Sequence, residues 1–196
     1  MEAFDVIRKD FGMGKHSRVS LVRCPELTLW IWKCPADDSK AHQMAFRKEI
    51  ERAKVWRQLD LSNVEVRWHE DKRSLFRTYV PGILALDRIR SREFWTDETY
   101  AEERRALTHL IVRAAQQGAY VNDLNPRNLI FDGTRWQIID SGSIRFRDSP
   151  EAILKKYRQR LLKAWSPHLH PAEHAFLWDF LQRLTLRGTR MICWFF

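Results

Sequence analysis

The 196-residue sequence has no long apolar run, no cysteine pair in CxxC spacing and no secretory signal pattern at its start. No run approaches the roughly 20 apolar residues that a membrane-spanning helix requires, so we expect no transmembrane segment. The three cysteines, Cys24, Cys34 and Cys193, predict reduced thiols in a cytoplasmic, reducing compartment. A secreted effector is the alternative, because an address that a secretion system reads can lack these patterns.

Internal repeats, linkers and low-complexity segments are also lacking, which favours one domain or two small lobes. Hydrophobic residues make up 44% of the chain and aromatic residues 12%, as in folded globular proteins. The formal net charge of +9 favours acidic partners: a nucleotide, an anionic lipid, an acidic protein surface or, less favoured, nucleic acid. Because the basic residues are spread along the chain, a solvated basic surface is the alternative.

Residues 120–143 carry the most informative pattern. Asp123 is followed by Asn128, two short apolar runs flank Asp132-Gly133, and Asp140 follows the second run. We predict a loop, a hairpin turning at Asp132-Gly133, and an acid just after the second strand. An acid that accepts a proton, beside an amide and a second acid that hold a divalent cation, is the minimum set for phosphoryl transfer.

Glycines and a lysine form a second pattern near the start of the chain. Gly12, Gly14 and Ser17 precede a strand-like run, and the next strand ends in Lys33. We expect these two strands to form a hairpin that turns near Cys24-Pro25-Glu26. Glycine lets backbone amides approach phosphates closely. A tight turn and an ordinary lysine at a strand end are the alternatives.

Periodicity and capping residues predict the remaining elements. The first helix is capped by Asp38 or Ser39, with one stripe formed by Met44, Ile50 or Glu51, Val55 and Leu59. A break at Tyr79-Val-Pro-Gly82 separates strands from a mostly helical region. The predicted helices cover 37–59, 99–117, 149–165 and 171–184. The second stops at Gly118, and the third is capped by Ser149. The predicted strands cover 64–69 and 74–79 and turn at 70–72.

Together these patterns resemble the protein-kinase-like superfamily over nearly the whole chain. The residues that carry the resemblance occur in the family's order: Gly12-x-Gly14, Lys33, a helix glutamate, a Pro-Gly break, Asp123 with Asn128, and Asp140-x-Gly142. The resemblance implies a two-lobed α+β fold. Its N-lobe, residues 1–80, would hold an antiparallel sheet and one helix, and its C-lobe, residues 81–196, would be short and mostly helical.

The resemblance also implies a role for each residue. Asp123 would be the catalytic base, and Asn128 and Asp140 would hold Mg²⁺, with Mn²⁺ as an alternative. Lys33 would bind the ATP phosphates with support from Glu51, which lies on the predicted stripe; Glu49 is the rival. The loop from Gly12 to Ser17 would cover the phosphates. The backbone at Thr78 and Val80 would bind adenine, unless this break is a simple strand-to-helix loop.

Several departures from the common kinase pattern favour a compact, atypical member. Val121-Asn122 replaces His-Arg, Asn125 replaces the loop lysine, Ser141 replaces the phenylalanine of the metal-binding motif, and no Ala-Pro-Glu sequence follows. These features resemble RIO-type kinases, bacterial lipopolysaccharide-sugar kinases and small secreted effector kinases. We expect a protein Ser/Thr kinase without activation-loop phosphorylation. A kinase of a sugar, glycolipid or other small molecule, and a pseudokinase scaffold, are the alternatives.

Three other features have simpler interpretations. His168, His170, Glu173 and His174 are crowded as in a zinc site, but two prolines interrupt them, so a shared helix face is not expected. The basic residues of 155–163 are predicted to form a solvated face, with Tyr157 on the opposite, apolar side. The apolar tail, residues 191–196, is expected to pack on the C-lobe.

Overall fold

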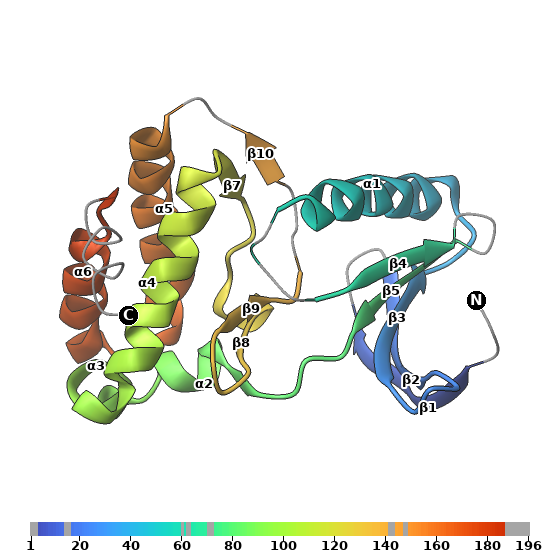
Figure 1. Ribbon diagram of the computed structural model, residues 1–196, viewed down its shortest axis with the longest axis horizontal. Coiled ribbons are helices and arrows are strands. Elements are labelled where there is room, and N and C mark those ends of the chain that lie inside the picture. Colours follow the sequence, from blue (N-terminus) through green and yellow to red (C-terminus); the bar gives the residue numbers. More distant parts are fainter. Residues whose placement is uncertain are drawn as a thin grey trace. The chain divides into compact units, whose positions relative to one another are not determined.

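The computed structural model describes residues 4–13, 17–59, 61, 64–69, 73–140, 144–146 and 149–186. The chain divides into two compact units, residues 1–80 and 81–196. Among the described elements, the strands are divided equally between the two units, and the second unit holds most of the helices (Figure 1). The boundary falls within the Tyr79–Gly82 break in the sequence pattern.

The first unit is built on a five-stranded antiparallel sheet in the order β1-β2-β3-β5-β4. The predicted β2–β3 hairpin is confirmed, and it turns after Cys24, where the Leu27 amide donates to the Cys24 carbonyl at 2.9 Å. Residues on both faces of β2 are buried, since Val19 and Val22 point to opposite sides of the sheet, and Val22 is fully buried. The strands are β1 (Asp5–Met13), β2 (Ser17–Arg23), β3 (Leu29–Pro35), β4 (Val66–His69) and β5 (Ser74–Thr78).

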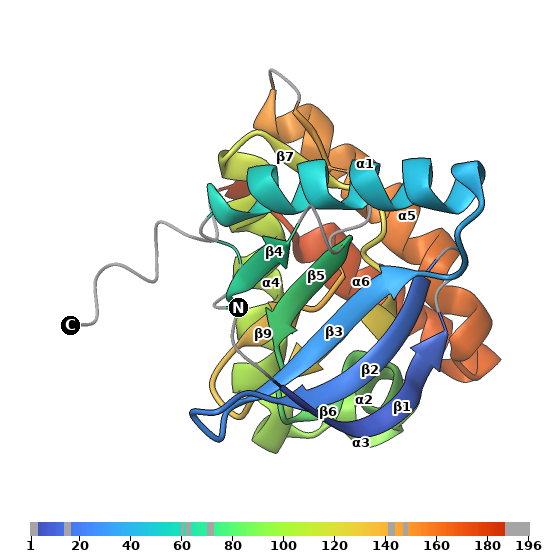
Figure 2. The ribbon, with the colours of Figure 1, turned by 90° about the vertical axis from the view of Figure 1, so that its right-hand side faces the viewer.

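The one helix of this unit, α1 (Lys40–Arg57), packs against β3 and β4 (Figure 2). It begins at Ser39, one of the two predicted caps, whose hydroxyl accepts the His42 amide. The predicted apolar stripe is confirmed at Ile50 but was wrong at Met44, which is 51% exposed. The buried stripe is Phe46, Ile50, Ala53 and Trp56, which repeats at helical spacing and contains larger aromatic side chains.

The β4–β5 hairpin has the predicted order, with both strands slightly shorter than expected. Four residue pairs join the strands, from Val66 opposite Arg77 to His69 opposite Ser74. The predicted turn at 70–72 lies outside the described residues.

The second unit is mostly helical and is centred on α4 (Ala101–Gln116), which contacts α5, β7 and β9. Its fully buried Leu107, Ile111 and Val112 face this core. The predicted stop at Gly118 is confirmed, since this glycine follows the helix with φ of +70°. The other helices are α2 (Ala85–Ile89), α3 (Arg92–Thr96), α5 (Pro150–Trp165) and α6 (His174–Arg183).

Two small antiparallel sheets lie beside these helices. One pairs β7 (Ala119–Val121) with β10 (Ile144–Phe146), and the other has the order β6-β8-β9. The predicted hairpin at Asp132-Gly133 is confirmed. It joins β8 (Leu129–Phe131) to β9 (Trp136–Ile138), and β6 (Ile83–Leu84) completes the sheet.

The α+β class is therefore confirmed, with an antiparallel sheet and several helices. In the part of the chain that the structure describes, no helix is both long and apolar enough to cross a membrane.

Candidate functional site

Lys33 is a buried cation in the centre of the first unit's sheet. Its residue is only 6% exposed, and its Nζ lies 2.7 Å from Glu49 Oε1. A buried ammonium group needs such a partner, because the loss of hydration is otherwise costly. Lys33 and Glu49 thus form an anchored pair between β3 and α1.

The prediction that Glu51 supports Lys33 was wrong. Glu51 is exposed and pairs with Lys54 at 2.7 Å on the outer side of α1. Glu49 lies one turn from Phe46 and Ala53, on the buried stripe that faces the sheet. The error follows directly from the wrong stripe, because a shift of two positions on a helix moves a side chain to the other face.

Sheet register aligns the glycine segment with Lys33. Gly12 at the end of β1 pairs with Val19 on β2, and Val19 pairs with Lys33 on β3. With strands about 4.8 Å apart, the Gly12 backbone and Lys33 lie two strands apart in one row. Ser17 begins β2 and is buried, while Gly14 lies outside the described residues.

The backbone amides of Thr78 and Tyr79, just before the boundary between the units, donate hydrogen bonds within the first unit. The Thr78 amide donates to the Glu65 carbonyl at 3.0 Å, so this amide is already used within the sheet and does not serve the predicted adenine contact. Next to it, the Tyr79 ring lies 6.0 Å from the ring of Phe11 in an edge-to-face arrangement. Phe11 is 37% exposed, so this unit presents an aromatic surface beside the Gly12 segment. Val80 is half-buried at the end of the unit.

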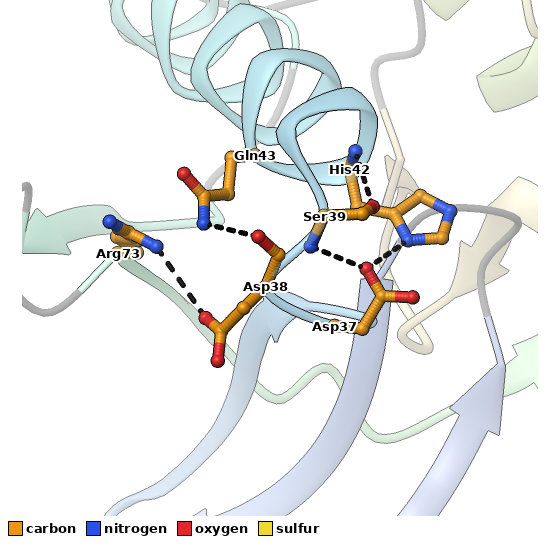
Figure 3. Close-up of polar contacts among 6 residues, drawn as sticks. All are labelled: Asp37, Asp38, Ser39, His42, Gln43 and Arg73. Carbon is orange, nitrogen blue, oxygen red and sulfur yellow. Dashed lines mark hydrogen bonds and ion pairs between the residues drawn. The ribbon is translucent and has the colours of Figure 1, made fainter.

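Polar contacts at the start of α1 fix the helix that carries Glu49 (Figure 3). Asp37 Oδ1 accepts the Ser39 amide at 2.9 Å and lies 2.8 Å from His42 Nδ1. These hydrogen bonds, chiefly those from Ser39, lower the pKa of Asp37 to about 2. Gln43 donates to the Asp38 carbonyl, and Arg73 pairs with the Asp38 carboxylate at 3.5 Å.

In the second unit, one loop holds two of the predicted site residues. Asn128 Nδ2 donates to the backbone carbonyl of Asp123 at 3.2 Å. A short 3₁₀ turn, Pro126–Asn128, closes the loop, and its cap is Asn125, whose Oδ1 accepts the Arg127 amide at 3.0 Å. Asn125, at the position where the resemblance leads one to expect a lysine, thus has a local structural role. The loop fixes Asp123 and Asn128 relative to each other.

Asp140 is joined to this loop through the next strand. The Ile139 amide donates to the Asn128 carbonyl at 2.9 Å, immediately beyond the β8–β9 pairing. The backbone therefore brings Asp140 beside Asn128, and both residues, like Asp123, are half-buried. Carboxylate and amide oxygens are hard ligands that suit Mg²⁺. Ser141 and Gly142, the rest of the predicted motif, lie outside the described residues.

The hairpin between Asn128 and Asp140 is stabilised by Asp132. Its carboxylate accepts hydrogen bonds from the amides of Thr134 and Arg135, both at 2.9 Å, and from the Gln137 side chain at 2.7 Å. Partial burial raises the pKa of Asp132, but these hydrogen bonds outweigh it and leave the pKa below its ordinary value. This acid therefore has a structural role in the turn.

Sequence patterns missed three side chains of α5 that reach the same loop. Tyr157, Arg160 and Trp165 make hydrogen bonds to the backbone of residues 119–124. Tyr157 was predicted only as an apolar core residue. Its ring is indeed buried, and burial raises the pKa of its hydroxyl. Side-chain contacts to a distant backbone leave no periodic signal in a sequence.

Two of the three crowded histidines, His170 and His174, make local contacts to the backbone. His170 Nδ1 accepts the Ala172 amide, the buried Glu173 accepts the His170 amide, and His174 contacts the Ser166 carbonyl. Among the described residues, no three His, Cys, Asp or Glu side chains gather as a metal site. The apolar tail at 191–196 lies outside the described residues.

Comparison with known families gives no matching family model, and no curated protein matches the sequence significantly. Function is therefore inferred from the two residue sets above. One is the buried Lys33–Glu49 pair of the first unit, and the other is the Asp123–Asn128 loop with Asp140 in the second.

Proposed function

We propose that this protein is an ATP-dependent phosphotransferase of a minimal, atypical kinase type. The observation that carries the proposal is the connected set in the second unit: Asn128 bonded to the Asp123 backbone, and Ile139 bonded to the Asn128 backbone beside Asp140. An acid, an amide and an acid held on one loop and one strand end are the groups that phosphoryl transfer requires.

In this proposal each group has one task. Asp123 orients the acceptor hydroxyl and takes its proton as the oxygen bonds to the γ-phosphorus and the bond to ADP breaks. Asn128 and Asp140 would hold Mg²⁺, or Mn²⁺, which neutralises phosphate charge when bound. Lys33, oriented by Glu49, binds the α- and β-phosphates. Such catalysis depends mainly on positioning and on charge stabilisation.

The first unit supports this proposal through its sheet. Gly12, Val19 and Lys33 lie in one row across three strands, so backbone amides near Gly12 and the Lys33 ammonium are suited to a polyphosphate. The exposed Phe11 ring, beside Tyr79, offers an aromatic face for a nucleotide base. A buried Lys–Glu pair alone would be compatible with a purely structural role.

The order of elements is a further support. A helix follows the third strand of a five-stranded antiparallel sheet, and the second unit places α4, a loop with Asp123 and the β8–β9 hairpin in succession. This order is similar to that of the protein-kinase-like fold. The proposed acceptor is a Ser or Thr hydroxyl of a protein.

A small-molecule hydroxyl is the second candidate acceptor. No Ala-Pro-Glu sequence follows Asp140, and such a segment helps other kinases to dock peptides. A sugar or glycolipid would need no such surface. The pseudokinase alternative is less favoured, because Lys33, Asp123, Asn128 and Asp140 are all retained.

The deciding experiment is incubation with γ-labelled ATP and Mg²⁺, alone and with cell extract, comparing wild type with Asp123→Asn. We expect labelled protein with the wild type, and a loss of at least about 100-fold in the variant, the lower end for general-base catalysis. Asp87→Asn, at an exposed acid on α2, is the matched control and should keep full activity. Undiminished transfer by Asp123→Asn would contradict the proposal, and labelled small molecules would identify the second acceptor class.

A further inference from the structure

Helix α5 contacts the backbone on both sides of Asp123. Arg160 Nε donates to the Asn122 carbonyl at 3.2 Å, and Trp165 Nε1 donates to the Leu124 carbonyl at 3.1 Å. Asp123 is the residue between these two carbonyls. Side chains of one helix therefore hold the backbone before and after Asp123, while the Asp123 carbonyl itself accepts a hydrogen bond from Asn128.

A third side chain fixes the strand that leads into the loop. The Tyr157 hydroxyl accepts the Val121 amide at 2.8 Å and donates to the Ala119 carbonyl at 3.0 Å. Tyr157 and Trp165 are fully buried, so water cannot easily replace these hydrogen bonds. Both the entry to the loop and the loop itself are held in the same way.

The contacts follow the same order along both segments. Tyr157, Arg160 and Trp165 contact residues 119–121, 122 and 124 in turn. Helix α5 also contacts β7, the strand that leads into this loop. With a rise of 1.5 Å per helical residue, the three side chains span about 12 Å. The helix therefore fixes the positions of successive backbone groups of residues 119–124.

We propose that Arg160 and Trp165, supported by Tyr157, are positioning residues that set the location of the Asp123 carboxylate for phosphoryl transfer. This inference rests on the proposed function, but the rigidity of the loop can be measured without it. With the Asn122 and Leu124 carbonyls held on either side, the Asp123 backbone has little freedom to rotate. A base displaced by about 1 Å loses up to about 100-fold in rate.

The kinetic test compares Arg160→Met with Arg158→Met. Arg158 lies on the same helix, and its guanidinium donates to the Leu184 carbonyl, away from the loop. We expect Arg160→Met to lower kcat by about 10- to 100-fold while KM for ATP stays within about twofold. Arg160→Lys, which keeps a cationic donor, should recover part of kcat. Trp165→Phe, which removes only the indole donor and some volume, should also lower kcat selectively.

A second measurement reports on the loop itself. Hydrogen–deuterium exchange of the peptide covering residues 119–128 should become faster in Arg160→Met and stay unchanged in Arg158→Met. If the wild type transfers no phosphate but this exchange pattern holds, the holding of the loop stands and the proposed function falls. Equal exchange and equal kcat in the two variants would overturn the positioning role. A parallel fall in kcat for both variants, with equal loop exchange, would also overturn it.

Discussion

Glu49 is the residue on which the structure most changes the sequence-based interpretation. It partners a lysine that is almost fully buried, whereas Glu51 forms an exposed pair with Lys54. A partner that faces the core is expected to matter for both stability and phosphate binding. A partner in water contributes little, because solvent screens the charges and the side chains lose freedom.

We predict that Glu49→Gln and Glu51→Gln differ sharply. Glu49→Gln should lower the free energy of unfolding by about 1–3 kcal/mol, the range for a charge-assisted hydrogen bond, and should raise KM for ATP. Glu51→Gln should stay within about 0.5 kcal/mol of the wild type. Urea unfolding and steady-state kinetics provide the measurements. Equal effects of the two substitutions would show that the ion pair to Lys33 has no special role.

Asp37 gives a prediction on pH. Hydrogen bonds from Ser39 and His42 lower its pKa from 3.8 to about 2. A carboxyl with a lowered pKa stabilises the folded state above its ordinary pKa, and this contribution is lost as the pH falls toward 2. We therefore expect wild type to have the higher Tm above pH 4, and its advantage over Asp37→Asn to shrink between pH 4 and 2. A Tm difference between the two proteins that stays constant from pH 4 to 2 would show that the ionisation of Asp37 does not contribute to stability.

At the scale of elements, the β6–β8 pairing depends on a close backbone approach at Gly82. This residue has φ of +148°, and a Cβ there would lie 2.2 Å from the Phe131 carbonyl oxygen. Gly133 has φ of +99°, but a Cβ would meet nothing within 4 Å. An alanine at Gly133 would therefore meet backbone strain alone, whereas an alanine at Gly82 would meet both backbone strain and a steric clash.

We expect Gly133→Ala to cost about 1 kcal/mol from its left-handed backbone alone. Gly82→Ala should cost about 3 kcal/mol, because the clash with Phe131 adds to the backbone strain. Urea unfolding of both variants measures the difference. Similar costs would mean that β6 can move away from β8 without loss of stability.

Elements with local signals could be predicted from the sequence, and those with distant partners could not. The Asp132-Gly133 hairpin, the Ser39 and Ser149 caps and the stop at Gly118 each depend on neighbouring residues. The predicted buried face of α1 was wrong at Met44. In this charged helix, the larger aromatic side chains of Phe46 and Trp56 face the core instead. The contacts of α5 to the loop were missed, since they join residues 36 to 41 positions apart.

At the scale of the whole molecule, the candidate residues are divided between the two units. The first unit holds Lys33 and Glu49, and the second holds Asp123, Asn128 and Asp140. The order of the motifs along the chain predicted which candidate residues lie in which unit, because each motif lies within one short segment. It could not predict that Asn128 and Ile139 link the loop to the strand end, since this contact depends on the β8–β9 register.

If both units contribute to nucleotide binding, a variant in either one should weaken it. ATP with Mg²⁺ at about 100 times its Kd should stabilise the wild type by about 2.7 kcal/mol and raise Tm accordingly. Lys33→Met, in the first unit, and Asp140→Asn, in the second, should each lose most of this shift, whereas Asp87→Asn should keep it. EDTA should reduce the wild-type shift, because the phosphates would lose their neutralising cation. A full shift in Asp140→Asn, or one insensitive to EDTA, would limit nucleotide binding to the first unit and remove the metal role from Asn128 and Asp140.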